Sequence, residues 1–172
     1  QYAESILAES KEYDYQMGIA IACKEISLIH FAHLALDKAL DYGYQALRIL
    51  KSCGKNHEIS HILCNIGVYY NALNLEEKGK EYFLQSIGYD RENIPPLINL
   101  GEYYVRQSQP DDAMDYFQQA LGIATENKKM GDLAFALKSM GEVYNSLKKV
   151  EKAIEYFERS LKVLSTLDEE HT

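Results

Sequence analysis

The stretch FALKSMGEVYNSLKKVEKAIEYFERSLKVL, residues 135 to 164, contains two segments with apolar residues at i, i+3, i+4 and i+7. This spacing is typical of one face of an α-helix. A short polar bend at 147–150 separates the two segments. Gly141 in the first and Ala153 in the second are small enough for two helices to pack at the short end of the usual interaxial range, about 8–10 Å. The stretch therefore predicts an antiparallel helical hairpin.

The same pattern occurs three more times upstream. The second helices align over residues 37–47, 77–87, 111–121 and 151–161, which places Tyr42, Tyr82, Tyr116 and Tyr156 at one position. The steps between these tyrosines are 40, 34 and 40 residues, and Ser27, Gly67, Gly101 and Gly141 in the first helices keep the same steps. A single hairpin cannot bury all its apolar faces, so copies must stack on one another. The fold class predicted is therefore all-α, an α-solenoid of antiparallel helix hairpins.

This pattern resembles the tetratricopeptide repeat family. The matching residues are Leu97, Leu100, Gly101, Tyr104, Ala113, Phe117 and Ala120 in the 34-residue copy, and Leu137, Met140, Gly141, Tyr144, Ala153 and Phe157 in the last copy. The 40-residue copies are similar to the longer variant of kinesin light chains, G-protein-modulating scaffolds, bacterial Rap-type regulators and arrays fused to bacterial signalling enzymes. The resemblance implies a right-handed solenoid of about four units preceded by a half-repeat.

We expect a single solenoid domain over residues 1–172, forming part of a larger protein. Its parts are a half-repeat at 1–14, repeats at about 15–54, 55–93, 94–128 and 129–166, and a tail at 167–172. The half-repeat has either lost its first helix or serves as a cap, and the tail is either frayed or leads to another repeat or domain. Repeat one is degenerate, with Gly43 where other copies have Phe. We expect Tyr44 to fill that space and the packing of this repeat to be looser.

Composition narrows the function classes. The 172 residues are 47% hydrophobic and carry a formal net charge of −8, which argues against binding to nucleic acid phosphates. No apolar run approaches the roughly 20 residues of a membrane span. Cys23, Cys53 and Cys64 are an odd number in a chain with ample apolar residues for a core, which favours a reducing, cytoplasmic environment.

Residues that could carry chemistry are few. Cys53, His57, His61 and Cys64 lie within twelve residues, and two histidines at i, i+4 could share a zinc ion. However, His57 and Cys64 are two helical turns apart, about 10 Å along the axis, and Cys53 belongs to a linker. The sequence also lacks a phosphate-binding loop, a dinucleotide-binding turn, a nucleophile elbow and an HExxH motif. We therefore predict no metal site, no cofactor and no enzymatic activity.

The resemblance implies that first-helix residues line a concave groove that binds peptides. Carried over by alignment, the groove residues are Ile21, Lys24, Leu28, Phe31, His61, Cys64, Asn65, Val68, Asn71, Ile98, Asn99, Glu102, Val105, Arg106, Phe135, Lys138, Glu142 and Asn145. Four of them are asparagines, whose carboxamide can both donate to and accept from a peptide backbone. They are either binding residues or ordinary solvated helix residues.

These observations predict a non-enzymatic protein-interaction scaffold that binds a peptide or helix. The family's clamp for C-terminal carboxylates places Asn where this sequence has Leu28, Val68, Glu102 and Glu142, so we expect apolar anchors rather than a terminal charge. The competing possibility is that a helix of the same protein already covers these apolar groove residues. Two other functions stay open: a regulatory domain controlling a fused signalling enzyme, such as a diguanylate cyclase or histidine kinase, and a self-association module using the terminal helices. We expect neither nucleic acid nor a membrane as partner.

Overall fold

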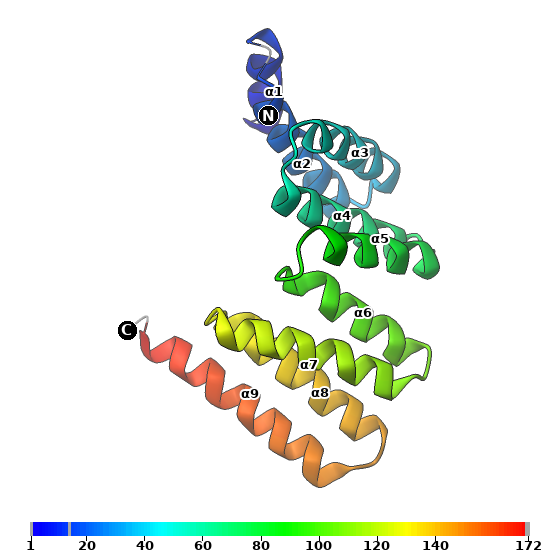
Figure 1. The fold of residues 1–172 in the computed structure, drawn as a ribbon, viewed down its shortest axis with the longest axis vertical. Coiled ribbons are helices and arrows are strands. Elements are labelled where there is room, and N and C mark those ends of the chain that lie inside the picture. Colours follow the sequence, from blue (N-terminus) through cyan, green and yellow to red (C-terminus); the bar gives the residue numbers. More distant parts are fainter. Residues whose placement is uncertain (1, 14, 171–172) are drawn as a thin grey trace. The chain divides into compact units, whose positions relative to one another are not determined.

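The computed structural model describes residues 2–13 and 15–170, with side chains to residue 166. These residues form helices and no strands (Figure 1), which confirms the all-α hairpin architecture. The helices are α1 (Tyr2–Glu12), α2 (Gln16–Ala32), α3 (Leu36–Ser52), α4 (Asn56–Ala72), α5 (Glu76–Tyr89), α6 (Ile94–Arg106), α7 (Pro110–Glu126), α8 (Met130–Ser146) and α9 (Val150–Glu170).

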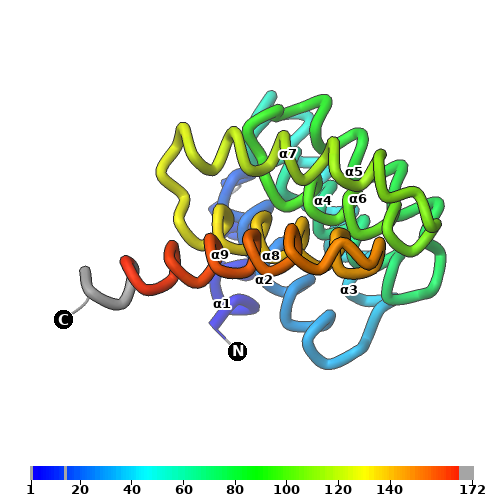
Figure 2. The backbone as a smooth tube through the Cα atoms, turned by 90° about the horizontal axis from the view of Figure 1, so that it is seen from below, coloured from blue at the N-terminus to red at the C-terminus, as the bar shows by residue number. Residues whose placement is uncertain are grey.

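The chain divides into two compact units, residues 1–93 (unit 1) and 94–172 (unit 2), at the boundary expected between repeats two and three. In unit 1, α1 packs on α2, and the hairpins α2–α3 and α4–α5 pack through α3 and α4. In unit 2, the hairpins α6–α7 and α8–α9 pack through α7 and α8 (Figure 2). A single continuous domain stays a prediction.

The core of each unit lies between its stacked hairpins. In unit 1 a buried cluster joins Ala20 and Cys23 of α2 to Ala46 and Leu50 of α3 and to Ile62 of α4. In unit 2 a smaller cluster is formed by Ala113, Phe117, Met140 and Val143. Each cluster draws on neighbouring repeats, so a hairpin removed from its neighbour would expose apolar surface to water.

At the predicted helix crossings of repeats two to four, the glycine of the first helix lies against an aromatic ring. A β-carbon built on Gly141 would lie 2.7 Å from Cε1 of Phe157, and one on Gly67 would lie 2.5 Å from Cε1 of Phe83. The three glycines of repeats two to four therefore make room for a phenylalanine from the second helix of the same hairpin. Any side chain at these positions would displace that ring.

Repeat one packs differently, and the expectation for Tyr44 is wrong. Tyr44 is 37% exposed, and its hydroxyl lies 2.8 Å from that of Tyr70 and 2.7 Å from that of Tyr82. The space beside Gly43 is approached by Ile66 and by the ring of Tyr69, whose hydroxyl is hydrogen-bonded to Ser27 at 2.7 Å. Side chains of repeat two therefore complete the core of repeat one.

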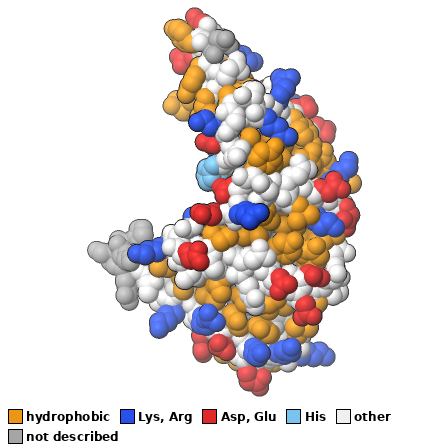
Figure 3. Space-filling view, viewed as in Figure 1, with side chains coloured by type: hydrophobic (Ala, Val, Ile, Leu, Met, Phe, Trp, Pro, Cys, Tyr) orange, Lys and Arg blue, Asp and Glu red, His pale blue; other side chains and the backbone are white. Residues whose placement is uncertain are grey.

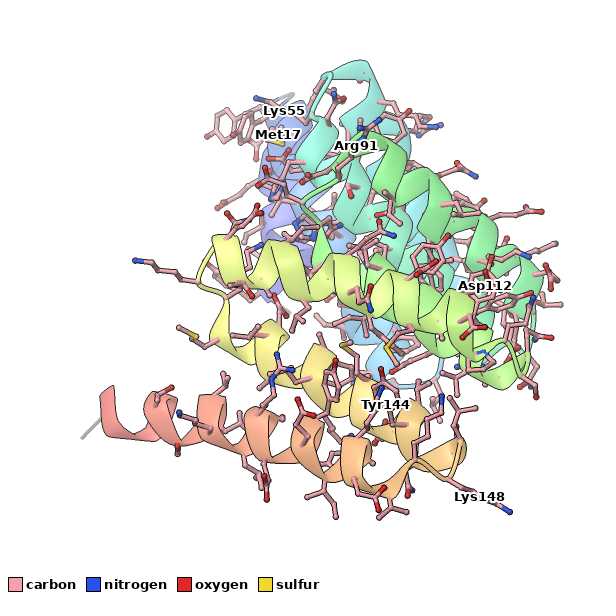
Figure 4. The ribbon with its side chains drawn as sticks, turned by 60° about the horizontal axis from the view of Figure 1, so that its bottom comes forward. Met17, Lys55, Arg91, Asp112, Tyr144 and Lys148 are labelled. Carbon is pink, nitrogen blue, oxygen red and sulfur yellow. The ribbon has the colours of Figure 1, made fainter. Side chains whose placement is uncertain are left out.

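Ring stacking recurs at the predicted repeat positions. Tyr70 stacks on Tyr82, Tyr104 on Tyr116 and Tyr144 on Tyr156, with centroids 5.2 to 5.5 Å apart. In repeat one His30 takes the first-helix place and stacks on Tyr42 at 5.6 Å. Figure 4 shows Tyr144 on α8 of the hairpin that α8 forms with α9. Each stack joins the two helices of one hairpin.

Six of the turns share one backbone motif. A residue with positive φ follows each helix cap: Leu34, Gly54, Asn74, Ser108, Lys128 and Lys148. After α2, the N–H of Leu34 donates to the carbonyl of Phe31 and that of Ala35 donates to the carbonyl of His30, both at 2.9 Å. These two hydrogen bonds define the Schellman motif, which satisfies carbonyls at the end of a helix. Lys148, in the turn between α8 and α9, points away from the helices in Figure 4.

The end of α5 differs, because its cap, Asp90, is extended with φ of −148°. The Oδ1 of Asp90 accepts the backbone N–H of Glu92 at 2.9 Å. Asn93 donates from Nδ2 to the hydroxyl of Ser60 at 2.8 Å, and Ser86 donates to the carbonyl of Ser60 at 2.7 Å. All three side chains are buried, so this network satisfies polar groups inside unit 1.

Candidate functional site

Two consecutive first helices of unit 1 meet around one cavity. It has a volume of about 380 Å³ and is called here the unit 1 cavity; its lining is Lys24, Leu28, His57, Glu58, His61 and Asn65. Four of these, Lys24, Leu28, His61 and Asn65, are predicted groove residues. The cavity combines an apolar side chain with donors and acceptors, which is typical of a binding site.

The histidines of this cavity form a hydrogen-bonded chain with Asp90. The Nδ1 of His57 lies 2.6 Å from Oδ2 of Asp90, and the Nε2 atoms of His57 and His61 are 3.1 Å apart. Burial raises the pKa of Asp90, but the hydrogen bonds from His57 and from the N–H of Glu92 outweigh it, and the resulting pKa is below the ordinary value. Asp90 is therefore ionised at neutral pH.

Unit 2 has a corresponding but smaller cavity. The unit 2 cavity has a volume of about 200 Å³, and its lining is Glu102, Val105, Arg106, Phe117, Ser139 and Glu142. Burial raises the pKa of Glu102; the charge of Glu142 adds to this rise, while Arg106 and Lys138 oppose it. Glu142 is ion-paired with Lys138 at 3.0 Å. Four predicted groove residues thus meet here: Glu102, Val105, Arg106 and Glu142. The carboxylate of Glu102 is half-buried.

Other predicted groove residues lie outside these two cavities. Ile21 and Phe135 are more than 40% exposed, and Lys138 lies over the ring of Phe135 at 5.7 Å. Phe31 contacts the ring of Tyr69, with centroids 4.9 Å apart. Cys64 is only 5% exposed, so it offers almost no surface to a ligand. Val68 and Ile98 are half-buried.

The four asparagines have different surroundings. Asn65 lines the unit 1 cavity, and Asn145 is exposed. Asn99 donates to the carbonyl of Pro95 within its own helix at 2.8 Å. The Oδ1 of Asn71 is buried without a hydrogen-bond partner, against the backbone of Gly79. A shared peptide-binding role for all four stays a prediction, for which Asn65 and Asn145 are better placed.

Sequence reasoning did not include several residues of these cavities. Glu58 and Phe117 were not assigned to the groove, and Asp90 joins His57 across 33 residues of sequence. It also missed an apolar pocket of about 420 Å³ in unit 2, where Leu121 of α7, Leu133 and Leu137 of α8 and Val163 of α9 meet. The sequence signal that could have located Glu58 in this cavity is its position directly after His57. Contacts across 33 residues leave no local signal.

Charge is dispersed over the surface. On the face shown in Figure 3, Lys and Arg side chains are scattered among Asp and Glu rather than gathered in one basic patch. Of the helices within the described residues, none combines the length and the apolar character needed to cross a bilayer.

Comparison with solved structures shows the same fold in other proteins. Aspartyl phosphate phosphatase F from Bacillus subtilis aligns with a TM-score of 0.82 and 20% identity over 89% of this chain and 42% of its own. BtubC from P. vanneervenii aligns with a TM-score of 0.75 and 18% identity over 89% of this chain and 66% of its own. The chain thus spans less than two thirds of either protein. A kinesin light chain-like repeat array of Podosopora anserina aligns at 0.71 and 12% identity, over 97% of this chain and 85% of its own.

Sequence comparison identifies the family directly. No curated protein sequence matches the chain significantly. Family models described as tetratricopeptide repeat match residues 60–93, 97–130 and 139–163, together more than half of the chain. The matched residues include the glycine and phenylalanine crossings and the stacked tyrosines of repeats two to four. The chain therefore belongs to the tetratricopeptide repeat family.

Proposed function

We propose that the chain is a protein-interaction module that binds a peptide or helical segment of a partner along the first helices of its repeats. Membership of the tetratricopeptide repeat family supports an interaction scaffold, and this fold is typically non-catalytic. The observation that carries the proposal is the unit 1 cavity, to which α2 contributes Lys24 and Leu28 and α4 contributes His61 and Asn65.

The chemistry of the two cavities indicates the class of ligand. Leu28 in unit 1 and Val105 in unit 2 offer apolar contact, and burial of apolar area contributes about 25 cal/mol per Å². Asn65 provides a carboxamide that can bind a peptide backbone. The ligand expected is a segment with apolar anchors whose affinity does not depend on a free C-terminal carboxylate.

The test is direct binding of peptides. Apolar-rich peptides selected from a displayed library would be labelled with fluorescein and titrated with the full chain, with anisotropy as readout. We expect Leu28→Asp to remove binding while helicity is retained. Leu84→Asp is the matched control, because Leu84 is an exposed leucine of α5 outside the cavity lining. Equal losses in the two variants contradict the proposal, and a large loss on amidation of the peptide contradicts the apolar-anchor mode.

One further observation favours self-association as a second candidate. Val150, Ile154, Leu161 and Leu164 of α9 are each more than 40% exposed and follow the i, i+4, i+11, i+14 spacing of one helix face. Such a face can pack against a helix of a second copy. Sedimentation velocity at several concentrations tests this. A monomer throughout, or an oligomer unchanged by Leu161→Asp, rejects it.

A further inference from the structure

The histidine pair near the start of α4 is held in a defined geometry by hydrogen bonds. His57 and His61 are one helical turn apart, and their rings are nearly perpendicular, at 83°. Their Nε2 atoms are 3.1 Å apart, and the Nδ1 of His57 is 2.6 Å from Oδ2 of Asp90. Three polar side chains, two from α4 and one from the residue that caps α5, thus form one chain of contacts. The role inferred for them below is separate from the proposed peptide binding.

Asp90 determines which nitrogen of His57 holds the proton. An ionised carboxylate can only accept hydrogen bonds, so the proton of a neutral His57 is on Nδ1. The Nε2 atom of His57 then carries a lone pair, and this is the atom that faces His61. In the absence of an ion, the Nε2–H of His61 donates to that lone pair. A cation that takes the place of this proton receives one lone pair from each ring, with His61 in its Nδ1–H tautomer.

The distance between the two nitrogens suits a metal ion. Two nitrogens bound at about 2.0–2.1 Å to one ion lie about 2.9 Å apart at a right angle and about 3.3 Å apart at the tetrahedral angle. The observed 3.1 Å is between these values. We propose that His57 and His61 bind one divalent transition-metal ion, Zn²⁺ or Ni²⁺, through their Nε2 atoms, with Asp90 as the positioning residue for His57. A carboxylate on the remaining ring nitrogen is the usual arrangement around a ligating histidine.

The remaining coordination positions open into the unit 1 cavity. Its volume of about 380 Å³ leaves room for water ligands, and the carboxylate of Glu58 lines the same space. Among the described residues there is no group of three or more His, Cys, Asp or Glu side chains arranged to hold a metal ion. In the proposed site the protein therefore supplies two ligands, and water supplies the others.

The two nearby cysteines are not ligands. Cys64 is 5% exposed, and burial raises the pKa of its thiol to about 12. Its side chain is not part of the lining of the unit 1 cavity, into which the remaining coordination positions open. Cys53 is exposed at the C-cap of α3. The site thus differs from the cluster of four Cys and His residues in the sequence, because Asp90 takes part and the cysteines do not.

Isothermal titration of the full chain with ZnCl₂, in a Cys53→Ser background at pH 7.5, tests the proposal. We expect one ion per chain, at least tenfold weaker binding for His57→Ala and for His61→Ala, and 10 to 100-fold weaker binding for Asp90→Asn, about the effect usual for an outer-shell carboxylate. Circular dichroism of each variant without metal verifies the fold. Binding that is not saturable, or that persists in the His57→Ala/His61→Ala double variant, overturns the metal site.

Two further measurements make the assignment specific. His33→Ala, which removes an exposed histidine of the turn after α2, is the matched control and should leave the zinc affinity unchanged. Nitrogen-15 spectra of the histidine rings should show Zn²⁺ shifting the Nε2 signals of His57 and His61 while Nδ1 of His57 keeps its proton. An unchanged affinity in Asp90→Asn overturns the role of Asp90, and a loss of affinity in His33→Ala overturns the choice of ligands.

Discussion

Gly101 lies directly against the ring of Phe117, so a β-carbon at Gly101 would come closer to three ring atoms than any ordinary carbon contact. Gly101→Ala should therefore lower the free energy of unfolding by about 1–3 kcal/mol, because the fully buried ring has no room to move. Urea denaturation of the two proteins measures the difference.

The matched control is Gly122→Ala in α7. A β-carbon at Gly122 would meet no atom within 4 Å, so only helix propensity changes there. We expect this substitution to raise the free energy of unfolding by about 1 kcal/mol. Changes of the same sign in the two variants would show that the ring contact does not explain the glycine.

Leu34 has φ of 57° in the Schellman motif after α2. A left-handed conformation costs an L-residue roughly 1–2 kcal/mol, and glycine avoids this cost. Leu34→Gly should therefore raise the melting temperature, even though the unfolded chain gains entropy. Gly54→Ala, at φ of 64°, should lower it. Calorimetry of both variants checks the pair, and a lower melting temperature for Leu34→Gly would contradict the reasoning.

Glu102 gives the chain a pH-dependent stability. Because its pKa is raised in the folded state, its ionised form disfavours folding at neutral pH, and this cost disappears as pH falls below the ordinary value of 4.5. Glu102→Gln should raise the melting temperature at pH 7.5 and have little effect at pH 4. Glu155→Gln, which removes an exposed ion pair with Arg159 in α9, should not show this gain. A gain of equal size at both pH values would assign the effect to packing.

Hydrogen exchange should distinguish the repeats. Repeat one has Ser27 and Gly43 in place of the glycine and phenylalanine crossing, and its hairpin is bounded on one side by the short helix α1. In a stack of repeats, the segment with the weaker interfaces opens first. We expect amides of residues 20–29 to exchange faster than those of residues 100–104. Slower exchange in residues 20–29 would contradict the expected order.

The helices could be predicted closely from sequence because the signals are local. The period of apolar residues predicts each hairpin. Pro95, Pro96 and Pro110 predict where α6 and α7 begin, because N–H groups in the first turn of a helix have no partner within the helix, so proline loses no hydrogen bond there. The alignment predicted shared repeat positions for the tyrosines, whereas their stacking in pairs is a finding of the structure. Because the repeats share these local signals, each hairpin can be predicted one repeat at a time.

The cavities could be predicted only in part, because their linings depend on contacts between distant residues. Alignment located Lys24, Leu28, His61 and Asn65, but the pairing of His57 with Asp90 spans 33 residues. The serine network of Ser60 and Ser86 spans 26. Five of the six Schellman turns have a residue other than glycine at positive φ. The glycines of the sequence therefore do not mark where these turns lie. Degenerate repeat one misled the prediction for Tyr44, since the space at Gly43 is filled from the next repeat.

The stacked tyrosines also give this chain a set of built-in optical reporters. The sequence has 14 tyrosines and no tryptophan, so its near-ultraviolet fluorescence comes from tyrosine alone. Repeats two, three and four each contain one stacked tyrosine pair, whereas repeat one pairs a histidine with Tyr42. Replacing both tyrosines of one pair with phenylalanine would remove the contribution of that pair, and the difference from the unmodified chain would report on one repeat. The order in which the repeats melt can then be recorded without attaching any dye.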